Sequence, residues 1–204
     1  MTEHALPCPT PDDPQRRTWL IASSVAGGAG ALAAAVPFVA SLGPSERAKA
    51  MGAAVEVDLS DLLPGGMKTV EWRGKPVWIL RRTPEQLEQL KGQESRLVDP
   101  GSKVAAQQPA YAQNETRSIR PDVFVAIGIC THLGCSPTPI PAGSANPSVG
   151  DAWQGGYFCP CHGSKFDGAG RVFKDMPAPT NLEIPPHTYL SETRLLIGQD
   201  EQAA

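Results

Sequence analysis

Apolar residues follow two patterns along the chain, one long run near the N-terminus and many short runs after it. Residues 18–42 carry no charged side chain, and this run exceeds the roughly 20 apolar residues that a membrane-spanning helix needs. It is rich in Gly and Ala, so a cleaved signal peptide is the alternative. The length favours a retained transmembrane helix, which Pro37 is expected to kink.

This run sets the expected division of the chain. Residues 1–17 would be a leader, 18–42 the anchor, 43–54 a flexible linker and 55–204 the folded domain. The linker is rich in small residues and carries mixed charge. This composition suits an ordinary spacer and a hinge equally well.

Short strands are predicted at the start of the folded domain. Residues 55–59 alternate between apolar and polar side chains, and residues 67–72 and 75–82 flank an Arg-Gly pair like the arms of a hairpin. Pro76 lies in the second arm and is expected to place that arm at a sheet edge, because proline cannot donate a backbone hydrogen bond.

A short helix is predicted directly after the hairpin. Thr83, Pro84 and Gln86 stand at the N-cap, the first helical position and the third helical position of a capping box. The helix is expected to end near Gly92, and residues 94–119 are polar and predicted to be irregular.

The second half of the domain is predicted to alternate short strands with loops. Residues 122–129 are β-branched and apolar, which is the pattern of a buried strand. The other expected features are a Pro/Gly/Ser-rich insertion at 136–156, a strand at 157–158, a hairpin over 165–173 and a last strand at 195–197. The predicted fold class is therefore mainly β, a small antiparallel β domain preceded by one N-terminal transmembrane helix.

Composition narrows the function classes. The chain has 204 residues with a net charge of −3, so no basic field points to nucleic acid. Its 21 prolines and 20 glycines agree with short strands and many turns.

Two short motifs carry the candidate chemistry. Residues 130–135 read CTHLGC and residues 159–164 read CPCHGS, so four of the five cysteines and two of the four histidines fall in these two boxes. Each box offers one Cys and one His at ligand-type spacing, plus one further Cys. Two thiolates and two imidazoles suit a metal of borderline softness, and the two extra cysteines could link the loops.

Three interpretations of the boxes compete. Two Cys and two His form a common structural zinc set, although zinc motifs usually pair Cys with Cys and His with His. The cysteines could instead form disulfides beside core histidines without any metal. The third interpretation is a two-iron, two-sulfide cluster in which two His replace two Cys on one iron, an arrangement that raises the reduction potential.

The motifs CTHLGC and CPCHGS resemble those of Rieske iron–sulfur proteins, and more narrowly those of the iron–sulfur subunits of quinol–cytochrome c reductases. The likeness covers roughly residues 55–198, with the cluster-binding loops at about 122–180. It implies a Rieske-type β domain with a cluster-binding subdomain and one [2Fe-2S] cluster. The residues it assigns are Cys130 and Cys159 on the inner iron, His132 and His162 on the outer iron, and a disulfide between Cys135 and Cys161.

The resemblance also assigns roles around the cluster. His162 would face the quinol and take up a proton, and Leu133 would contact the quinone pocket. Ser164 would donate its hydroxyl to a sulfide of the cluster. Phe166 stands where the family has a tyrosine that reaches a ligand sulfur, so this hydrogen bond is expected to be missing.

Backbone roles complete the expected site. Gly134 and Gly163 would permit tight loop geometry. Pro177 and Pro179 resemble the family's proline loop, which covers the cluster from a third side, although Met176 stands where the family usually has Gly. His187 lies outside both boxes and is interpreted as a structural or surface histidine.

The partners and the location are likewise implied by the resemblance. The chain would be an enzyme subunit that is not active alone, working with a cytochrome b subunit, a c-type cytochrome and ubiquinol in a dimeric assembly. The alternatives are the Rieske subunit of a periplasmic arsenite oxidase and a non-enzymatic Rieske ferredoxin. Ferredoxins lack the second cysteine pair, which favours the quinol-oxidising branch.

Arg16 and Arg17 precede the apolar run and resemble a twin-arginine export signal. Export of a folded chain would keep a cofactor that is assembled in the cytoplasm, and a disulfide needs an oxidising compartment. The expected location is therefore the bacterial inner membrane, single-pass, with the cluster domain on the periplasmic side. Cys8 has no evident role.

Overall fold

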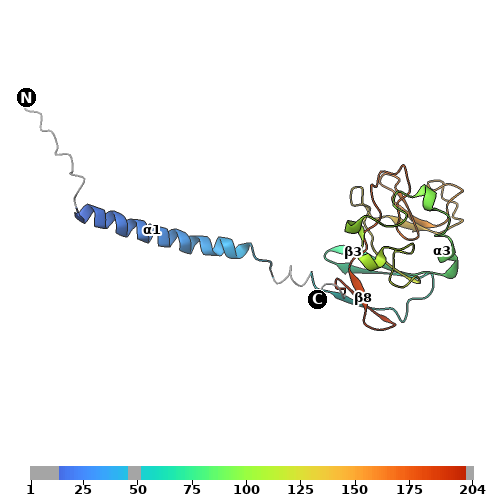
Figure 1. The fold of residues 1–204 in the computed structure, drawn as a ribbon, viewed down its shortest axis with the longest axis horizontal. Coiled ribbons are helices and arrows are strands. Elements are labelled where there is room, and N and C mark those ends of the chain that lie inside the picture. The colour runs from blue at the N-terminus through green and yellow to red at the C-terminus, as the bar shows by residue number, and fades with distance from the viewer. Residues whose placement is uncertain (1–13, 46–51, 201–204) are drawn as a thin grey trace, which may run out of the picture. The chain divides into compact units, whose positions relative to one another are not determined.

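The computed structural model describes residues 14–45 and 52–200, in two separate units within residues 1–49 and 50–204 (Figure 1). Expectations that concern residues 1–13, with Cys8, and residues 46–51 of the linker lie outside the described residues. Each unit is considered by itself below.

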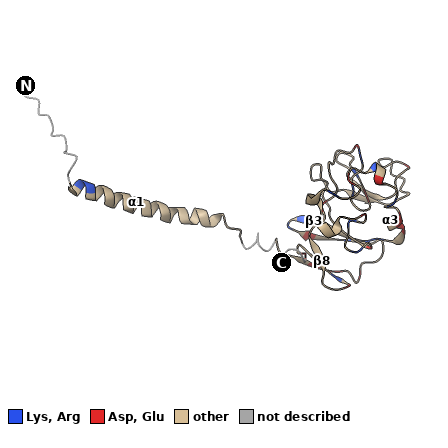
Figure 2. Ribbon diagram, in the orientation of Figure 1, with Lys and Arg blue, Asp and Glu red and all other residues tan. Residues whose placement is uncertain are grey.

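The first unit is the helix α1, Pro14–Ser41. All its residues are exposed, and it is long and apolar enough to cross a membrane by length and composition. It continues through Pro37, and Arg16 and Arg17 lie in its first turn. Figure 2 shows that these arginines are the charged residues of the helix and that the rest of its length is uncharged.

The second unit contains three antiparallel sheets, each with three strands. Their orders are β1-β9-β8, β2-β3-β4 and β5-β6-β7. The strands are β1 Val55–Asp58, β2 Met67–Trp72, β3 Lys75–Arg81, β4 Val123–Ile127, β5 Thr138–Ile140, β6 Gly156–Phe158, β7 Lys165–Asp167, β8 His187–Tyr189 and β9 Arg194–Ile197. The predicted mainly β, antiparallel fold class is thus confirmed.

The predicted hairpin between β2 and β3 forms around a two-residue turn. Trp72 pairs with Lys75 across it, and both turn residues are left-handed, with φ of 51° at Arg73 and 72° at Gly74. Positive φ values at both central residues identify a type I′ turn, whose twist matches that of the two paired strands. Arg73 also lies over the ring of Trp72, with its guanidinium carbon 4.6 Å from the ring centroid.

The prediction that Pro76 places its strand at a sheet edge is wrong, because β3 lies between β2 and β4. The ladder between β3 and β4 begins at Val77, paired with Ile127, one residue after the proline. Pro76 contributes only its carbonyl on that side, which accepts from the N–H of Gly128 at 2.8 Å. Because Pro76 stands before the first pair of this ladder, the donor that it lacks is missing at the end of the ladder and not within it.

The predicted capping box is present at the helix α3, Pro84–Glu88. The Thr83 hydroxyl accepts from the backbone N–H of Gln86, and the Gln86 side chain accepts from the N–H of Thr83. The polar stretch after it contains three short 3-10 turns, η1 Glu94–Arg96, η2 Ala105–Gln107 and η3 Ala110–Ala112.

Strand β4 is buried along its whole length and β3 is buried at its centre, so these two strands pack on both faces of their sheet. Along β4, Val123, Val125 and Ile127 pack into one hydrophobic cluster with strands β1 and β9, whereas Phe124 and Ala126 pack into a second cluster. Trp78 of β3 joins the second cluster, which also contains the cysteines of the two boxes. Because side chains alternate between the two faces of these strands, one face packs against β1 and β9 and the other face packs into the cluster around the cysteines.

The insertion between the boxes is more ordered than expected, since it contains the unpredicted strand β5. Ile140, Val149 and Trp153 pack with Leu97 and Phe173 in a third, smaller cluster. The indole N–H of Trp153 donates to the carbonyl of Ile140 at 3.0 Å. The insertion therefore covers the side of the cluster-binding part.

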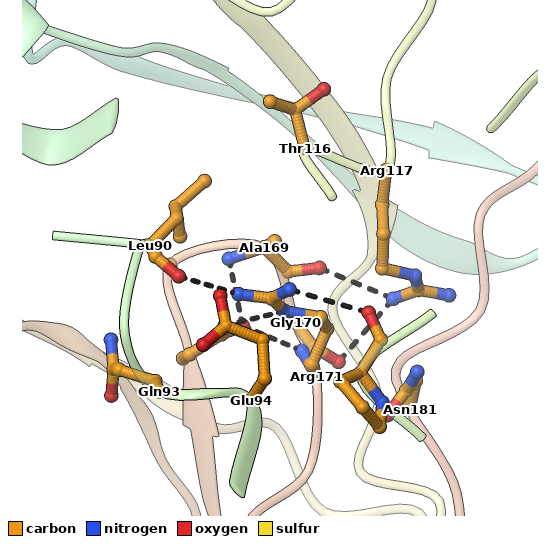
Figure 3. A network of polar contacts seen from close by, with 12 residues as sticks. Leu90, Gln93, Glu94, Thr116, Arg117, Ala169, Gly170, Arg171 and Asn181 are labelled. Atoms are coloured by element: carbon orange, nitrogen blue, oxygen red, sulfur yellow. Dashed lines mark hydrogen bonds and ion pairs between the residues drawn. The ribbon is translucent and has the colours of Figure 1, made fainter. Parts of the chain in front are cut away.

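A buried polar network holds the predicted hairpin over 165–173 (Figure 3). The Asp167 carboxylate accepts from the Arg171 side chain at 2.7 Å and from the backbone N–H groups of Ala169 and Arg171. Arg117 donates to the carbonyls of Ala169, Gly170 and Leu182. The arginines and the aspartate are fully buried, so every one of these bonds is shielded from solvent. The second arm of the hairpin adds a single bridge, between Phe166 and Val172.

His187 gives the fold a pH-dependent element. The ring is buried, its Nδ1 lies 2.8 Å from the carbonyl of Pro185, and it meets the ring of Tyr111 edge to face. Its role is therefore structural, as predicted. Burial lowers the pKa of His187 below its ordinary value, and the Pro185 carbonyl and Asp200 only partly offset this effect.

We predict that His187 makes stability fall with acidification. Because the folded-state pKa lies below the unfolded value of about 6.5, the unfolded chain binds the extra proton first, and stability is lost as pH falls below that value. Denaturant unfolding at pH 7.5 and pH 5.5 should show a larger loss for the natural chain than for His187→Gln. Equal losses in the two proteins would contradict this role.

Candidate metal centre

The first box lies on the loop that follows β4. The backbone N–H of Cys130 donates to the carbonyl of Cys135 at 2.7 Å, and that of Gly134 donates to the carbonyl of Cys130 at 3.1 Å. These bonds close a tight turn that carries His132 and Leu133 at its tip. Gly134 has a φ of 84° and open space around its Cα, so the turn needs glycine for its backbone conformation and not for room.

The second box, between β6 and β7, repeats the same turn. The N–H of Cys159 donates to the carbonyl of Ser164 at 2.8 Å, and that of Gly163 donates to the carbonyl of Cys159 at 2.9 Å. Gly163 has a φ of 80°. One structural unit is thus used twice, with the first cysteine of each box at the same place in the turn.

A disulfide joins the two loops. Cys135 and Cys161 are bonded, with Cα atoms 6.6 Å apart, as the resemblance implies. Among the described residues Cys130 and Cys159 remain as free cysteines, and both are buried. The sulfur of Cys159 lies within 4.8 Å of both disulfide sulfurs, so the cross-link is next to a candidate ligand.

The two histidines of the boxes face each other across the gap between the loops. Their ring centroids are 4.6 Å apart and their planes are at 87°. Nδ1 of His132 is buried and has no hydrogen-bond partner among the residues that the structure describes. A buried polar atom without a partner is costly, and a bound metal would satisfy it.

The environment of Cys130 also favours a metal. Burial raises the pKa of its thiol, and hydrogen bonds from the His132 backbone and the Ser164 hydroxyl only partly offset this effect. Cys159 lies close enough to share a hydrogen bond with it. A thiolate is therefore unfavourable here by itself, whereas a coordinating cation would deprotonate the thiol.

These four side chains form a donor set that fits the iron of a Rieske cluster, and the same set occurs in zinc sites. The site has a buried and an exposed side. The free cysteines are buried, His132 is half-buried and His162 is exposed. Leu133, which is 71% exposed, stands beside them as an apolar group in solvent. A partner molecule would thus meet the histidines and Leu133 first.

Ser164 is buried and connects two sides of the site. Its Oγ accepts from the backbone N–H of Ala178 at 3.0 Å. Because this bond occupies a lone pair, the hydroxyl proton remains available for sulfur, in agreement with its contact with Cys130.

Phe166 packs in the same buried cluster as Cys130 and Cys159. It pairs with Tyr157 across β6 and β7. The ring therefore lies beside the candidate ligands and offers no hydroxyl.

The predicted proline loop, residues 176–179, and the Thr180 that follows it are hydrogen-bonded to both boxes. Ala178 bonds to Ser164 of the second box, and the hydroxyl of Thr131 in the first box donates to the carbonyl of Thr180 at 2.7 Å. Pro177 and Pro179 are exposed on either side of the buried Ala178. The role of Thr131 could not be predicted from a local motif, because its partner lies 49 residues away.

Comparisons with known proteins agree with this geometry. Residues 53–186 match the family model described as Rieske [2Fe-2S] domain. The ubiquinol–cytochrome c reductase iron–sulfur subunit of Allochromatium vinosum is 56% identical over 93% of this chain and 91% of its own. The subunit of the same name from Bradyrhizobium diazoefficiens is 39% identical over 92% and 96%.

A solved structure described as a hyperthermophilic respiratory complex III aligns with 88% of this chain and 98% of its own, at 29% identity and a TM-score of 0.43. That score is low, so the family assignment depends on the sequence matches. The relatives' names agree with the quinol-oxidising branch and not with the arsenite oxidase or ferredoxin alternatives.

We predict that the disulfide stabilises the site measurably. Replacing both partners, in the double variant Cys135→Ser and Cys161→Ser, should lower the free energy of unfolding by about 3–4 kcal/mol, because the cross-link closes a loop of 26 residues. Cluster absorbance should also decay faster during dialysis. The exposed neighbour Ser136, changed to Ala, is the control. Unchanged stability together with unchanged cluster loss would contradict the prediction.

Proposed function

The chain belongs to the family of Rieske iron–sulfur subunits of ubiquinol–cytochrome c reductase, and on this premise we propose that it passes single electrons from ubiquinol to a c-type cytochrome. A Rieske cluster accepts one electron at a raised potential. We propose that Cys130 and Cys159 hold one iron and that His132 and His162 hold the other. The observation that carries the proposal is a donor set with two buried cysteines on one side and the exposed His162, beside Leu133, on the other.

The exposed tip suits quinol oxidation, which releases a proton with each electron. His162 is the more exposed of the two histidines, and the ring nitrogen that does not bind iron can hold that proton. Leu133 offers an apolar contact beside it. A cytochrome b subunit would supply the rest of the quinol pocket, so the chain has no complete active site of its own.

We propose a membrane-anchored, single-pass arrangement for the whole chain, within a dimeric assembly. Helix α1 has the length and composition of an anchor, residues 1–17 form the leader and residues 43–54 form a hinge. Arg16 and Arg17 support twin-arginine export, and the disulfide supports a periplasmic location for the domain that starts at residue 55.

A redox titration of the full-length chain, monitored by electron paramagnetic resonance, tests the function. We expect a mixed-ligand two-iron signal that ascorbate reduces, with a midpoint in the upper part of the roughly −150 to +300 mV range of Rieske centres. A negative midpoint would instead indicate a ferredoxin or an oxygenase component. Bound zinc without such a signal would overturn the proposal.

We predict that Phe166→Tyr raises the midpoint potential. A hydroxyl added at this buried position can donate to a ligand sulfur, and a bond worth about 1 kcal/mol more in the reduced state corresponds to about 40 mV for one electron. Phe158→Tyr is a matched control, because Phe158 packs in the cluster of the insertion and not with the cysteines. A midpoint that fails to rise in Phe166→Tyr would contradict this tuning.

A further inference from the structure

A cavity of about 490 Å³ opens between the first half of the domain and the cluster-binding part. One wall comes from the end of β3 and from α3, and the opposite wall comes from β5 and from the start of β6. Its volume falls within the usual range for small-molecule sites. None of the four candidate cluster ligands lines it.

The lining is amphipathic. Met67, Leu80 and Ile140 supply apolar walls, and Gln86 and Gln89 supply amide groups near helix α3. Such a cavity would hold an apolar body, with polar groups in fixed places to orient it.

Arg82 places a buried cation at one side of this cavity. Its guanidinium donates to Ser118 Oγ, to the carbonyl of Pro121 and to the carbonyl of Gly168. None of these acceptors is a carboxylate. Burial lowers the pKa of Arg82 only to about 10, so the side chain keeps its charge at neutral pH.

Two donors beside the cavity are left without partners. Nε of Arg82 and the hydroxyl of Tyr157 are buried and have no hydrogen-bond partner among the described residues, and both residues belong to the lining. Both atoms are enclosed, so a ligand in the cavity would reach them after their side chains shift. An unpaired buried donor is unfavourable, and an acceptor bound there would remove this penalty.

Three carboxylates act near Arg82. Asp167 is buried and is bonded to Arg171 and to its own turn. Glu85 lines the cavity and Asp122 also acts on Arg82, but Glu85 is exposed and Asp122 is half-buried, so solvent screens them more than the buried groups. Among the buried groups Arg82, Arg117 and Arg171 outnumber Asp167, which favours a negatively charged ligand beside Arg82.

We propose that this cavity binds a small monocarboxylate with an apolar body, whose carboxylate is recognised by Arg82 and Tyr157. The apolar walls take the body of the ligand. A phosphate or sulfate would leave these walls without a partner and is therefore disfavoured. The site is separate from the proposed cluster ligands, so binding there is independent of the electron-transfer proposal.

Phenylacetate is a suitable probe, and phenylacetamide is its neutral counterpart of the same shape. The full-length chain with its cluster, in a non-ionic detergent, would be titrated with each compound by isothermal calorimetry. We expect saturable binding of one phenylacetate per chain. We expect phenylacetamide to bind roughly tenfold more weakly, because charge-assisted hydrogen bonds are the stronger ones.

Three variants make the test specific. Tyr157→Phe removes the hydroxyl and should weaken phenylacetate binding roughly fivefold. Ala142→Trp adds a large ring to an exposed position of the lining and should abolish binding without touching Arg82. Ala145→Trp adds the same ring to an exposed position of the same loop that does not line the cavity, and should bind as the natural chain does.

Several results would overturn the proposal. Absence of saturable binding would mean that water alone satisfies the two donors. Equal affinity for phenylacetate and phenylacetamide would rule out recognition of the carboxylate. Binding that survives Ala142→Trp would place the compound at another site or in the detergent.

Discussion

A metal centre shared between two loops can form only if the loops are held at a fixed separation. Here each loop closes on itself with the same pair of backbone bonds, and the bond between Cys135 and Cys161 joins them. Ser164 and Thr131 then tie both loops to the proline segment. The donors are therefore positioned by the chain itself, and the cluster meets a site that is largely arranged in advance.

The first loop is held in place by β4, which is buried on both faces. Because side chains alternate along β4, one set packs against β1 and β9 and the other set packs into the core around the cysteines. The stacking of Trp78 on Tyr157, with ring centroids 5.0 Å apart, carries this contact from β3 to the strand that precedes Cys159. A rigid connection of this kind suits a domain that must present its tip in one orientation.

Most of the fold and of the candidate site could be predicted from local patterns. Features that depend on partners distant in the sequence could not. The turn at Gly74, the capping box at Thr83 and the spacing of the boxes are short-range features that the order of neighbouring residues determines. The sheet position of Pro76 depends on where β4 ends, and three-residue strands such as β5 have no detectable period. Arg117 lies in a stretch predicted to be irregular, yet it is fully buried and donates to carbonyl groups within residues 169–182.

The side of the site that would hold the cluster is buried, and the side that would exchange electrons and protons is exposed. The thiol side is enclosed, where exclusion of water protects the sulfur ligands, and the imidazole side is open to solvent. Electron transfer needs close approach, and proton release needs a path to water, so in the proposed function the exposed His162 would serve both better than the buried cysteines. Leu133 adds an apolar surface at the same tip, so contact with an apolar partner would not require any movement of the buried half.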